Sequence, residues 1–400
     1  MTAHLPALGR RSLLLGLGAA ITLPRARVAF AQAPGEARFA VVLLRGGLDG
    51  LFAVQPYGEP GFGELRGALA LPEPGQEGGL LDLGGRFGLH PRMPQLHAMY
   101  AANEALLIHA VAGNWRTRSH FDAQDLLESG ADQRLNSGWL NRALSAVPAR
   151  PGAQPNGLAV GADLPLLMRG PTQVGTYSRR GGGAPSPDLM ARIAELNHTD
   201  PLTGPAIIEG LQARGYAMEA LGMDAGARPP PGGAFRTLAQ AAGRLLARPD
   251  GPRIAAFELT GWDTHAQQVN RLPGPLGQLD DGLAALKEAL GDHWRRTAVL
   301  VTTEFGRTVR INGTGGTDHG TGGIAFLVGG AVAGGRIGGD WPGLSERTLF
   351  QGRDLAPTTD LRSLAKGLLR DHLKLQDQAV ARAFPGSDAA APSGGLLRSG

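Results

Sequence analysis

Carboxylates and histidines recur directly after or before apolar runs of this sequence, in the residue types that bind divalent metal ions. Asp263 and His265 follow one such run, and Asp318 and His319 lie in a glycine-rich loop before another. Mixed histidine and carboxylate ligation suits Zn²⁺ or Mn²⁺, with Ca²⁺ less favoured. Four carboxylates would balance two divalent cations, so one or two ions are expected. The candidate ligands are Asp49, His120, Asp263, His265, Glu304, Asp318 and His319.

A segment rich in hydroxyl groups supplies the candidate nucleophile. Ser119, with Thr117 as the alternative, precedes a predicted helix, where free backbone N–H groups favour an anionic ester oxygen. Two nearby cations would stabilise the entering and leaving oxygens in displacement at phosphorus or sulfur, and would activate a serine or water. Arg116, Arg118 and Arg307 are candidates for bidentate binding of the anion. This combination predicts cleavage of a small anionic ester.

Several of these residues also have a purely structural interpretation. Asp49 lies between glycines and, taken alone, is more typical of a turn. Ser119, with Asp122 three residues on, resembles a capping box, so its hydroxyl could cap a helix. Glu304 and Arg307 could form a salt bridge with each other. Both interpretations stay open at this level.

The two Asp/His pairs differ in how well a structural role explains them. Asp263 and His265 could simply satisfy each other as a hydrogen-bonded pair. Asp318 and His319 are harder to explain in this way, because they lie among six glycines between 313 and 323. Such glycine density lets the backbone approach a ligand closely at an entropic cost that stability alone would not favour.

Apolar runs alternate with amphipathic segments along the chain. This alternation predicts an α/β fold with a mostly parallel central sheet and helices on both faces. Functional groups of such sheets gather at the carboxyl ends of the strands. Segment 151–233 is expected to be a loop-rich insertion with a helix over 201–223, and 388–400 a disordered tail. The predicted strands are 37–44, 105–111, 253–259, 298–303 and 324–328, and the predicted helices are 93–103, 119–128, 235–248, 276–290 and 360–373.

Residues 1–31 have the anatomy of an export signal. The pair Arg10-Arg11 precedes an apolar run that ends near Leu23 and is too short to span a bilayer of roughly 30 Å. Ala29-Phe30-Ala31 supplies a small-x-small cleavage pattern. The arginine pair marks the twin-arginine route, with an ordinary secretory signal as the alternative. We therefore expect the twin-arginine translocase as a partner, a periplasmic or secreted location and no stable membrane span.

Composition argues against a nucleic-acid-binding protein and against a protein that depends on cysteine chemistry. The formal net charge is +4, but residues 1–31 carry four arginines and no acidic residue, so the rest of the chain is neutral. With no block of Lys and Arg interleaved with aromatics, nucleic-acid binding is not expected. The chain contains no cysteine, which excludes disulfides and a thiol nucleophile.

Several motifs resemble those of a known bacterial family. They occur in order from about residue 39 to residue 375, which covers nearly the whole predicted mature domain of 32–387. The family is domain of unknown function 1501 (DUF1501), grouped by remote similarity with the alkaline phosphatase and sulfatase superfamily. The resemblance implies an alkaline-phosphatase-like α/β fold. The motifs are LLRGGLDGL, RSHFDAQDLLE, SGWLNR, GWDTHAQQ, TEFGRTVRINGTGGTDHGTGG and GDWPGL.

The resemblance also implies roles for individual residues. Ser119 would match the nucleophile at a helix N-terminus, with Thr117 as the fallback. The implied metal ligands are Asp49 after the first strand, Asp263, His265 and His319 on one ion, and Glu304 on the other.

The sequence departs from the superfamily pattern at several points, one of which is that the superfamily commonly spaces its aspartate and histidine wider than Asp263 and His265. Glu304-Phe305 stands where an Asp-His step is usual, so a second ion would need Asp318 or His120 to complete its shell. The residues after Ser119 lack the Pro and Arg of serine-type sulfatases, which favours phosphate over sulfate esters. The expectation is an exported, metal-dependent hydrolase with a serine nucleophile. The alternative is a non-catalytic exported protein that keeps the fold and binds a ligand or partner.

Overall fold

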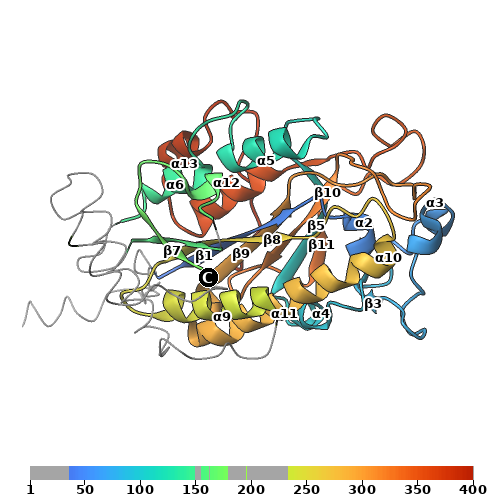
Figure 1. Cartoon of the computed structure of the whole chain (residues 1–400), viewed down its shortest axis with the longest axis horizontal. Helices are drawn as coiled ribbons and strands as arrows, with labels where there is room; N and C mark the ends of the chain where they lie inside the picture. Colours follow the sequence, from blue (N-terminus) through green and yellow to red (C-terminus); the bar gives the residue numbers. More distant parts are fainter. Residues whose placement is uncertain (1–35, 149–154, 162, 179–194, 196–232, 400) are drawn as a thin grey trace, which may run out of the picture. The chain divides into compact units, whose positions relative to one another are not determined.

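The computed structural model describes residues 36–148, 155–161, 163–178, 195 and 233–399 (Figure 1). The predicted export signal, the predicted helix over 201–223 and most of segment 151–233 therefore lie outside the described residues. Within the described ranges, no helix is both long enough and apolar enough to cross a bilayer.

The main sheet has nine strands in the described part of the chain, and all of them but β10 run in the same direction. Its order is β11-β5-β10-β9-β1-β8-β6-β7, with β12 also paired to β5, and β10 is antiparallel to both β5 and β9. This confirms the predicted α/β class and mostly parallel sheet. The strands are β1 (Arg38–Arg45), β5 (Ala105–Ala112), β6 (Gly157–Val160), β7 (Val174–Tyr177), β8 (Ile254–Thr260), β9 (Thr297–Thr303), β10 (Gly323–Val328), β11 (Arg336–Gly338) and β12 (Thr359–Asp360).

Helices cover both faces of this sheet. In Figure 1, α4, α9 and α11 lie below it, and α5, α6, α12 and α13 lie above it. A small sheet of β2 (Val54–Gln55), β3 (Leu81–Asp82) and β4 (Gly88–Leu89) stands apart. The helices are α2 (Gly50–Ala53), α3 (Phe62–Arg66), α4 (Pro94–Ala101), α5 (His120–Ser129), α6 (Trp139–Leu144), α9 (Ala234–Ala247), α10 (Gln268–Arg271), α11 (Pro273–Leu290), α12 (Leu361–Asp371) and α13 (Asp377–Ala383), with 3₁₀ turns at Gly67–Leu69, Leu166–Met168 and Gly291–Arg296.

Alternation along β1 shows how one strand serves two cores. Val42 and Leu44 join the apolar cluster that contains α4, α9 and α11. Val41 and Leu43 point to the other face and join the cluster that contains α5, α6, α12 and α13. Successive side chains of a strand point to opposite faces, so a strand covered on both sides is apolar throughout.

Strand direction explains why residues far apart in sequence meet at one edge. The carboxyl ends of β8, β1 and β9 are adjacent and precede Asp263, Gly46 and Glu304 respectively. Because β10 is antiparallel to β9 and β5, its start lies at that same edge, together with the end of β5. His319 before β10 and His120 after β5 therefore lie at the edge where β8 and β9 end.

Two motifs of the family resemblance serve the fold. Trp139 of SGWLNR stacks on Phe384, with ring centroids 5.1 Å apart, and Asn141 donates to the carbonyls of Met168 and Thr172. Trp341 of GDWPGL donates its ring N–H to Glu59 at 3.0 Å. Buried polar groups paired in this way hold connecting segments in place.

Two expectations about chain organisation need correction. The loop-rich interpretation of 151–233 missed β6 and β7, which extend the main sheet; both are only four residues long, and a run that short carries little periodicity. The tail from 388 to 399 is not disordered. Ala333 N–H donates to Leu396 O, and the buried Lys366 ammonium donates to Ala390 O. Small residues in the tail let its carbonyls reach these donors.

Buried His372 makes the stability of the fold depend on pH. Burial lowers its pKa to about 4, while its ring nitrogen Nε2 contacts Arg38 O at 2.8 Å. The unfolded chain, with an ordinary pKa of about 6.5, gains protons first, so the free energy of unfolding falls as the pH drops from 6.5 towards 4. Chemical denaturation at pH 7 and pH 5 should show about 2 kcal/mol less loss of stability in His372→Gln than in the wild type. Equal losses would contradict this assignment.

Candidate metal centre

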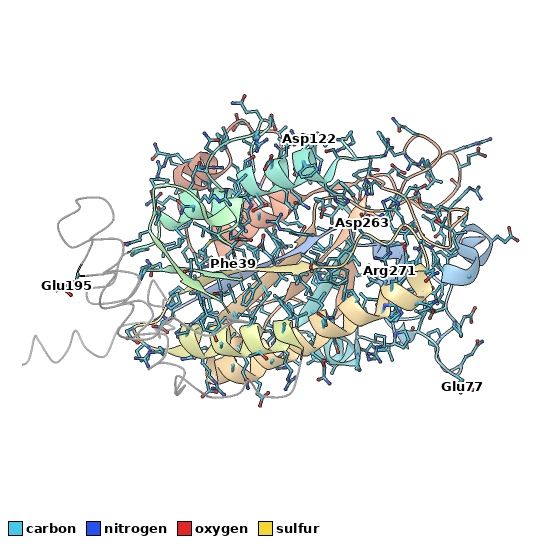
Figure 2. All side chains as sticks on the ribbon, in the orientation of Figure 1. Phe39, Glu77, Asp122, Glu195, Asp263 and Arg271 are labelled. Carbon is cyan, nitrogen blue, oxygen red and sulfur yellow. The ribbon has the colours of Figure 1, made fainter. Side chains whose placement is uncertain are left out.

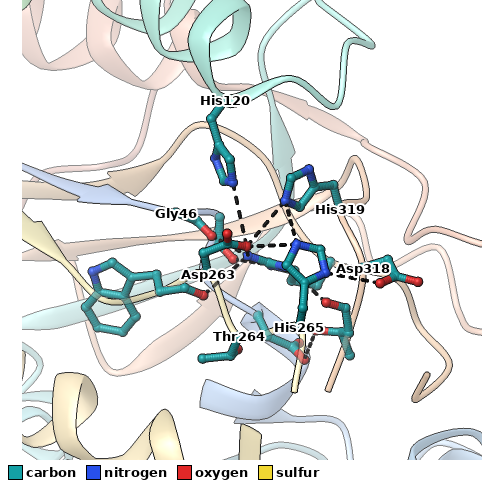
Figure 3. A network of polar contacts seen from close by, with 12 residues as sticks. Gly46, His120, Asp263, Thr264, His265, Asp318 and His319 are labelled. Atoms are coloured by element: carbon teal, nitrogen blue, oxygen red, sulfur yellow. Dashed lines mark hydrogen bonds and ion pairs between the residues drawn. The ribbon is translucent and has the colours of Figure 1, made fainter. Parts of the chain in front are cut away.

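Three imidazole rings and one carboxylate converge at this edge of the sheet (Figure 3). Asp263 Oδ1 lies 3.0 Å from His265 Nε2, 3.3 Å from His319 Nε2 and 3.6 Å from His120 Nε2. The Nε2 atoms of His265 and His319 are 2.9 Å apart. In Figure 2, Asp263 lies between α5, which carries Asp122, and α10, which ends at Arg271. We refer to His120, Asp263, His265 and His319 as the four-residue cluster.

The other ring nitrogen of each histidine faces a hydrogen-bond acceptor. His120 Nδ1 contacts Glu304 Oε1 at 2.7 Å, and His265 Nδ1 contacts Asp318 Oδ1 at 3.1 Å. His319 Nδ1 contacts the backbone oxygen of Arg118 at 2.7 Å. Ionised carboxylates and carbonyls cannot donate, so each Nδ1 carries the proton. In the neutral rings every Nε2 therefore presents a lone pair to the centre of the cluster.

Lone pairs facing one another in this way call for a positive charge between them. Two acceptor nitrogens 2.9 Å apart repel unless a proton or cation lies between them, and the Arg307 guanidinium, which binds Asp263 Oδ1, approaches His265 Nε2 only to 3.5 Å. Among the described residues, His120 Nε2 is buried without a hydrogen-bond partner, as an open metal ligand would be. Ligand atoms of a tetrahedral zinc shell are about 3.3 Å apart. One ligand atom each from His120, Asp263 and His319 lies within 4.8 Å of the other two, and His265 Nε2 adjoins this group at 2.9 Å from His319 Nε2 and 3.0 Å from Asp263 Oδ1. The residues present therefore fit a divalent metal ion.

Glu304 supports His120 from behind and is not itself part of the cluster. Burial alone would raise the pKa of Glu304, but hydrogen bonds from His120, Gln124 and Gly46 N–H lower it to about 2. The hydrogen bond to Glu304 in turn raises the pKa of His120. The carboxylate stays ionised and fixes the ring tautomer, the usual role of an outer carboxylate behind a metal-binding histidine. Glu304 was expected to bind a second metal ion, but its carboxylate is instead used in hydrogen bonds within the protein.

Arg307 forms an ion pair with Asp263 and is buried, so it is not open to a substrate anion. Its guanidinium is fully buried and donates to Asp263 Oδ1 and to the carbonyls of Gly46, Gly47 and Thr317. Burial would raise the pKa of Asp263, but the hydrogen bond and charge of Arg307 lower it to about 2. The expected binding of a substrate anion by Arg307 is therefore wrong, and the alternative of a Glu304–Arg307 salt bridge is not formed. The sequence could not show that Arg307 pairs with Asp263, which lies on another loop, and not with Glu304.

Charge at the site matches one divalent ion better than two. Asp263, Glu304 and Asp318 carry three negative charges, and Arg307 carries one positive charge, which leaves −2 with the imidazoles neutral. Asp318 is half-exposed, and a hydrogen bond from Asn312 lowers its pKa, so it remains charged. Its contact is with His265 Nδ1, and Asp318 thus lies behind a cluster residue, as Glu304 does.

Asp49 lies outside the cluster and has a structural role. It is buried, caps α2 by accepting from Phe52 N–H, and forms a salt bridge with the fully buried Arg66. Gln268 donates to the same oxygen as Arg66 at 2.7 Å, and Thr317 approaches it at 3.4 Å. Because these donors use both of its carboxylate oxygens, Asp49 is not available to a metal, contrary to expectation. Arg66 is the residue that pairs with Asp49, and no motif or spacing in the sequence indicates this pairing.

Ser119 lies at the N-terminus of α5 between two residues that face the cluster. Its side chain does not cap the helix, which removes the capping alternative. Arg118 before it supplies the backbone oxygen that contacts His319 Nδ1, and His120 follows it. Thr117 Oγ1 accepts from Ser119 N–H at 3.2 Å. Ser119 therefore precedes a cluster residue in the sequence and its hydroxyl has no capping role, while Thr117 orders its backbone.

The side chains of two candidate anion-binding arginines are engaged elsewhere. Arg118 donates through Nε and a terminal nitrogen to Asp354, whose side chain is fully buried. Arg116 donates to the carbonyls of Gly113 and Trp115. Arg118 thus contributes its backbone oxygen to the site, whereas its guanidinium anchors a neighbouring loop.

Glycines of the 313–323 loop bring backbone against backbone rather than against a ligand. A Cβ on Gly316 would lie 2.3 Å from the carbonyl carbon of His265. Gly46 has φ of +125°, and a Cβ there would lie 2.7 Å from Asp263 N. Larger residues cannot adopt these positions without displacing the segments that carry the cluster. Gly316 and Gly46 thus let neighbouring backbone pack directly against the segment that carries Asp263 and His265.

Two supporting residues were missed in the sequence. Phe305 is buried and packs its ring against His120 and His319, with centroids 4.9 Å away from each. Gln124 donates to Glu304 Oε1 at 2.9 Å. The signal for Gln124 was available, because it lies four residues after His120 and thus on the same face of a helix. No local pattern marks Phe305, since an apolar residue after a strand is common.

Comparison with known proteins places the chain in a family. Residues 102–384, more than half of the chain, match the family described as "Protein of unknown function (DUF1501)". The chain belongs to the DUF1501 family. The matched part of this DUF1501 protein includes all four residues of the cluster, as well as Ser119 and Glu304, but not Asp49.

Distant likenesses to solved structures accompany this match. Ps i-CgsB in complex with k-i-k-neocarrahexaose has a TM-score of 0.43 at 9% identity, covering 89% of this chain and 77% of its own. A protein of the alkaline phosphatase superfamily from Vibrio parahaemolyticus has a TM-score of 0.35 at 12% identity, covering 74% and 61%. The C-terminal periplasmic domain of EcEptC from Escherichia coli, in complex with Zn, has a TM-score of 0.34 at 10% identity, covering 74% of both chains. No curated protein matches this DUF1501 sequence.

Proposed function

We propose that this DUF1501 protein is a hydrolase of small anionic esters, phosphate esters above sulfate esters, that works with one divalent metal ion held by the four-residue cluster. One observation carries the proposal: every histidine Nδ1 of the cluster faces an acceptor, so three Nε2 lone pairs and Asp263 Oδ1 point at one another. Zinc or manganese suits this ligand set better than calcium.

The metal would supply Lewis acidity, stabilising charge on the ester oxygens and favouring ionisation of a nearby hydroxyl. The chain's own residues do the rest. His120 is held by Glu304, and His265 by Asp318, so the ligand atoms are oriented before anything binds. Arg307 neutralises Asp263 and keeps the loops after β1 and β8 together.

Ser119 is the proposed nucleophile. It precedes the ten-residue helix α5, whose first backbone N–H groups favour an anionic oxygen beside the serine. With the candidate arginines engaged elsewhere, the helix terminus and the metal are the groups left to bind the ester anion. In the reaction Ser119 Oγ would form a bond to phosphorus as the ester oxygen leaves, and water would later release the phosphate.

Export belongs to the same proposal. We infer that residues 1–31 direct the protein through the twin-arginine translocase to the periplasm or beyond, on the basis of the arginine pair and the short apolar run. That route carries folded proteins, so the metal site can be filled before export.

Metal-dependent ester cleavage tests the proposal. Full-length protein, stripped with chelator and then given one equivalent of Zn²⁺ or Mn²⁺, should hydrolyse an aryl phosphate, while the stripped protein should be at least about 100-fold slower. An aryl sulfate should be a poorer substrate. Protein that binds the metal and remains inert on both esters would contradict the hydrolase and favour the non-catalytic binding protein.

A further inference from the structure

A side-chain network extends from the four-residue cluster into the protein along α5. Behind His120 lies Glu304, and behind Glu304 lies Gln124, whose Nε2 donates to Glu304 Oε1 at 2.9 Å. Arg45, the last residue of β1, donates to Gln124 Oε1 at 3.0 Å. The order outward from the cluster is thus His120, Glu304, Gln124 and Arg45.

Both ends of the Gln124 amide are used, which gives the side chain one orientation. Its oxygen must accept from Arg45, because a guanidinium has no acceptor, and its nitrogen must then donate to Glu304. A reversed amide would place oxygen against the Glu304 carboxylate and nitrogen against Arg45, which is repulsive at both contacts. Glu304 therefore meets a donor whose direction is set by Arg45.

Arg45 is itself firmly held. It donates to Glu258 through Nε at 2.6 Å and forms an ion pair with Glu128 at 2.8 Å. Glu128 is buried and accepts from Leu167 N–H through its other oxygen at 2.8 Å. Two carboxylates on different elements fix this guanidinium, so it can serve as the immobile end of the network.

We propose that Gln124 is a positioning residue of the candidate metal centre, coupling Glu304 to the Arg45 anchor so that His120 Nε2 is held towards the metal. This inference rests on the proposed metal-dependent function and deepens it. Glu304 Oε1 also accepts from Gly46 N–H and His120, so Gln124 completes three donors on one oxygen and limits rotation of the carboxylate. Residues behind a metal-binding histidine typically change metal affinity by about 10–100-fold when removed.

The test measures zinc affinity of the full-length protein by competition with a chelating dye. Gln124→Met keeps the length of the side chain and removes both hydrogen bonds, and Gln124→Ala is the second variant should the first not fold. Asp122→Asn is the control, since Asp122 is exposed on the same helix. Each Gln124 change is made in the wild type and in His120→Ala. We expect about tenfold weaker zinc binding in the wild-type background and less than about twofold change in His120→Ala.

The background comparison separates positioning from general damage. A positioning role acts only through His120, so its effect disappears with that ring. An equal loss in both backgrounds would mean that α5 is disturbed as a whole, and it would overturn the inference. Wild-type affinity in the Gln124 variants would also overturn it and leave the metal centre standing. A wild-type protein that binds no zinc would instead overturn the metal centre, and the role of Gln124 with it.

Discussion

Replacing His319 by alanine is expected to weaken zinc binding by about 10²–10³-fold, a larger effect on metal affinity than that of the Gln124 variants. Structural zinc sites bind with about 10–16 kcal/mol in all, so each of four ligands accounts for roughly 2.5–4 kcal/mol. His319 Nε2 is near the middle of the cluster, 2.9 Å from His265 Nε2 and 3.3 Å from Asp263 Oδ1. Calorimetric titration of the stripped protein with Zn²⁺ measures the change.

The control is His97→Ala, which removes a histidine of α4 whose Nε2 contacts Asp82 O. Its zinc affinity should equal that of the wild type. In chelator, His319→Ala should lower the free energy of unfolding only by the packing lost against Phe305. The variant also removes one of two nitrogens that repel each other in the metal-free protein, which offsets part of that loss. Unchanged zinc affinity in His319→Ala would show that the cluster does not hold the ion.

Replacing Ser119 by alanine is expected to reduce ester hydrolysis by at least about 10³-fold while zinc affinity stays within about twofold. Loss of a nucleophile removes the covalent step, whereas the ligand atoms of the cluster come from other side chains. Ser119 makes no side-chain cap, so the variant should not unravel α5. Initial rates on an aryl phosphate, with zinc binding measured on the same samples, separate the two quantities.

Ser145→Ala is the matched control, because Ser145 is exposed at the end of α6 and donates only to a local carbonyl. It should keep the wild-type rate. Full hydrolysis in Ser119→Ala would remove the serine nucleophile, and loss of zinc binding in that variant would instead give Ser119 a structural role. If Ser119→Ala keeps full hydrolysis, Thr117→Val in the same assay tests Thr117 as the alternative nucleophile.

The fold was predictable from the sequence because its signals are local. An apolar run such as β1, flanked by a glycine turn, is buried on both faces, and no partner needs to be known to recognise it. The antiparallel direction of β10 was not predictable in this way. Its residues pattern like those of the parallel strands, and only its pairing with β5 and β9 sets its direction. That direction nevertheless decides where His319 lies.

The candidate site was predictable in its residue types and less so in their roles. The sequence placed Asp263, His265 and His319 near strand ends, and the structure brings them together with His120. Asp49 and Arg307 were misassigned because each is neutralised by a residue from another loop, Arg66 in one case and Asp263 in the other. Such pairings depend on the folded chain and have no signature in spacing. Exposure differs between the two paired aspartates: the side chain of Asp49 is buried, whereas that of Asp263 is 46% exposed.

Anomalous diffraction from crystals of the protein grown with Zn²⁺ tests the central claim most directly. We expect one strong peak at the zinc edge, about 2.0–2.2 Å from His120 Nε2, His265 Nε2, His319 Nε2 and an Asp263 oxygen. Glu304 and Asp318 should remain behind the histidines they hold. Absence of a peak among these four side chains in zinc-loaded crystals, or a peak bound by Asp49 instead, would contradict it.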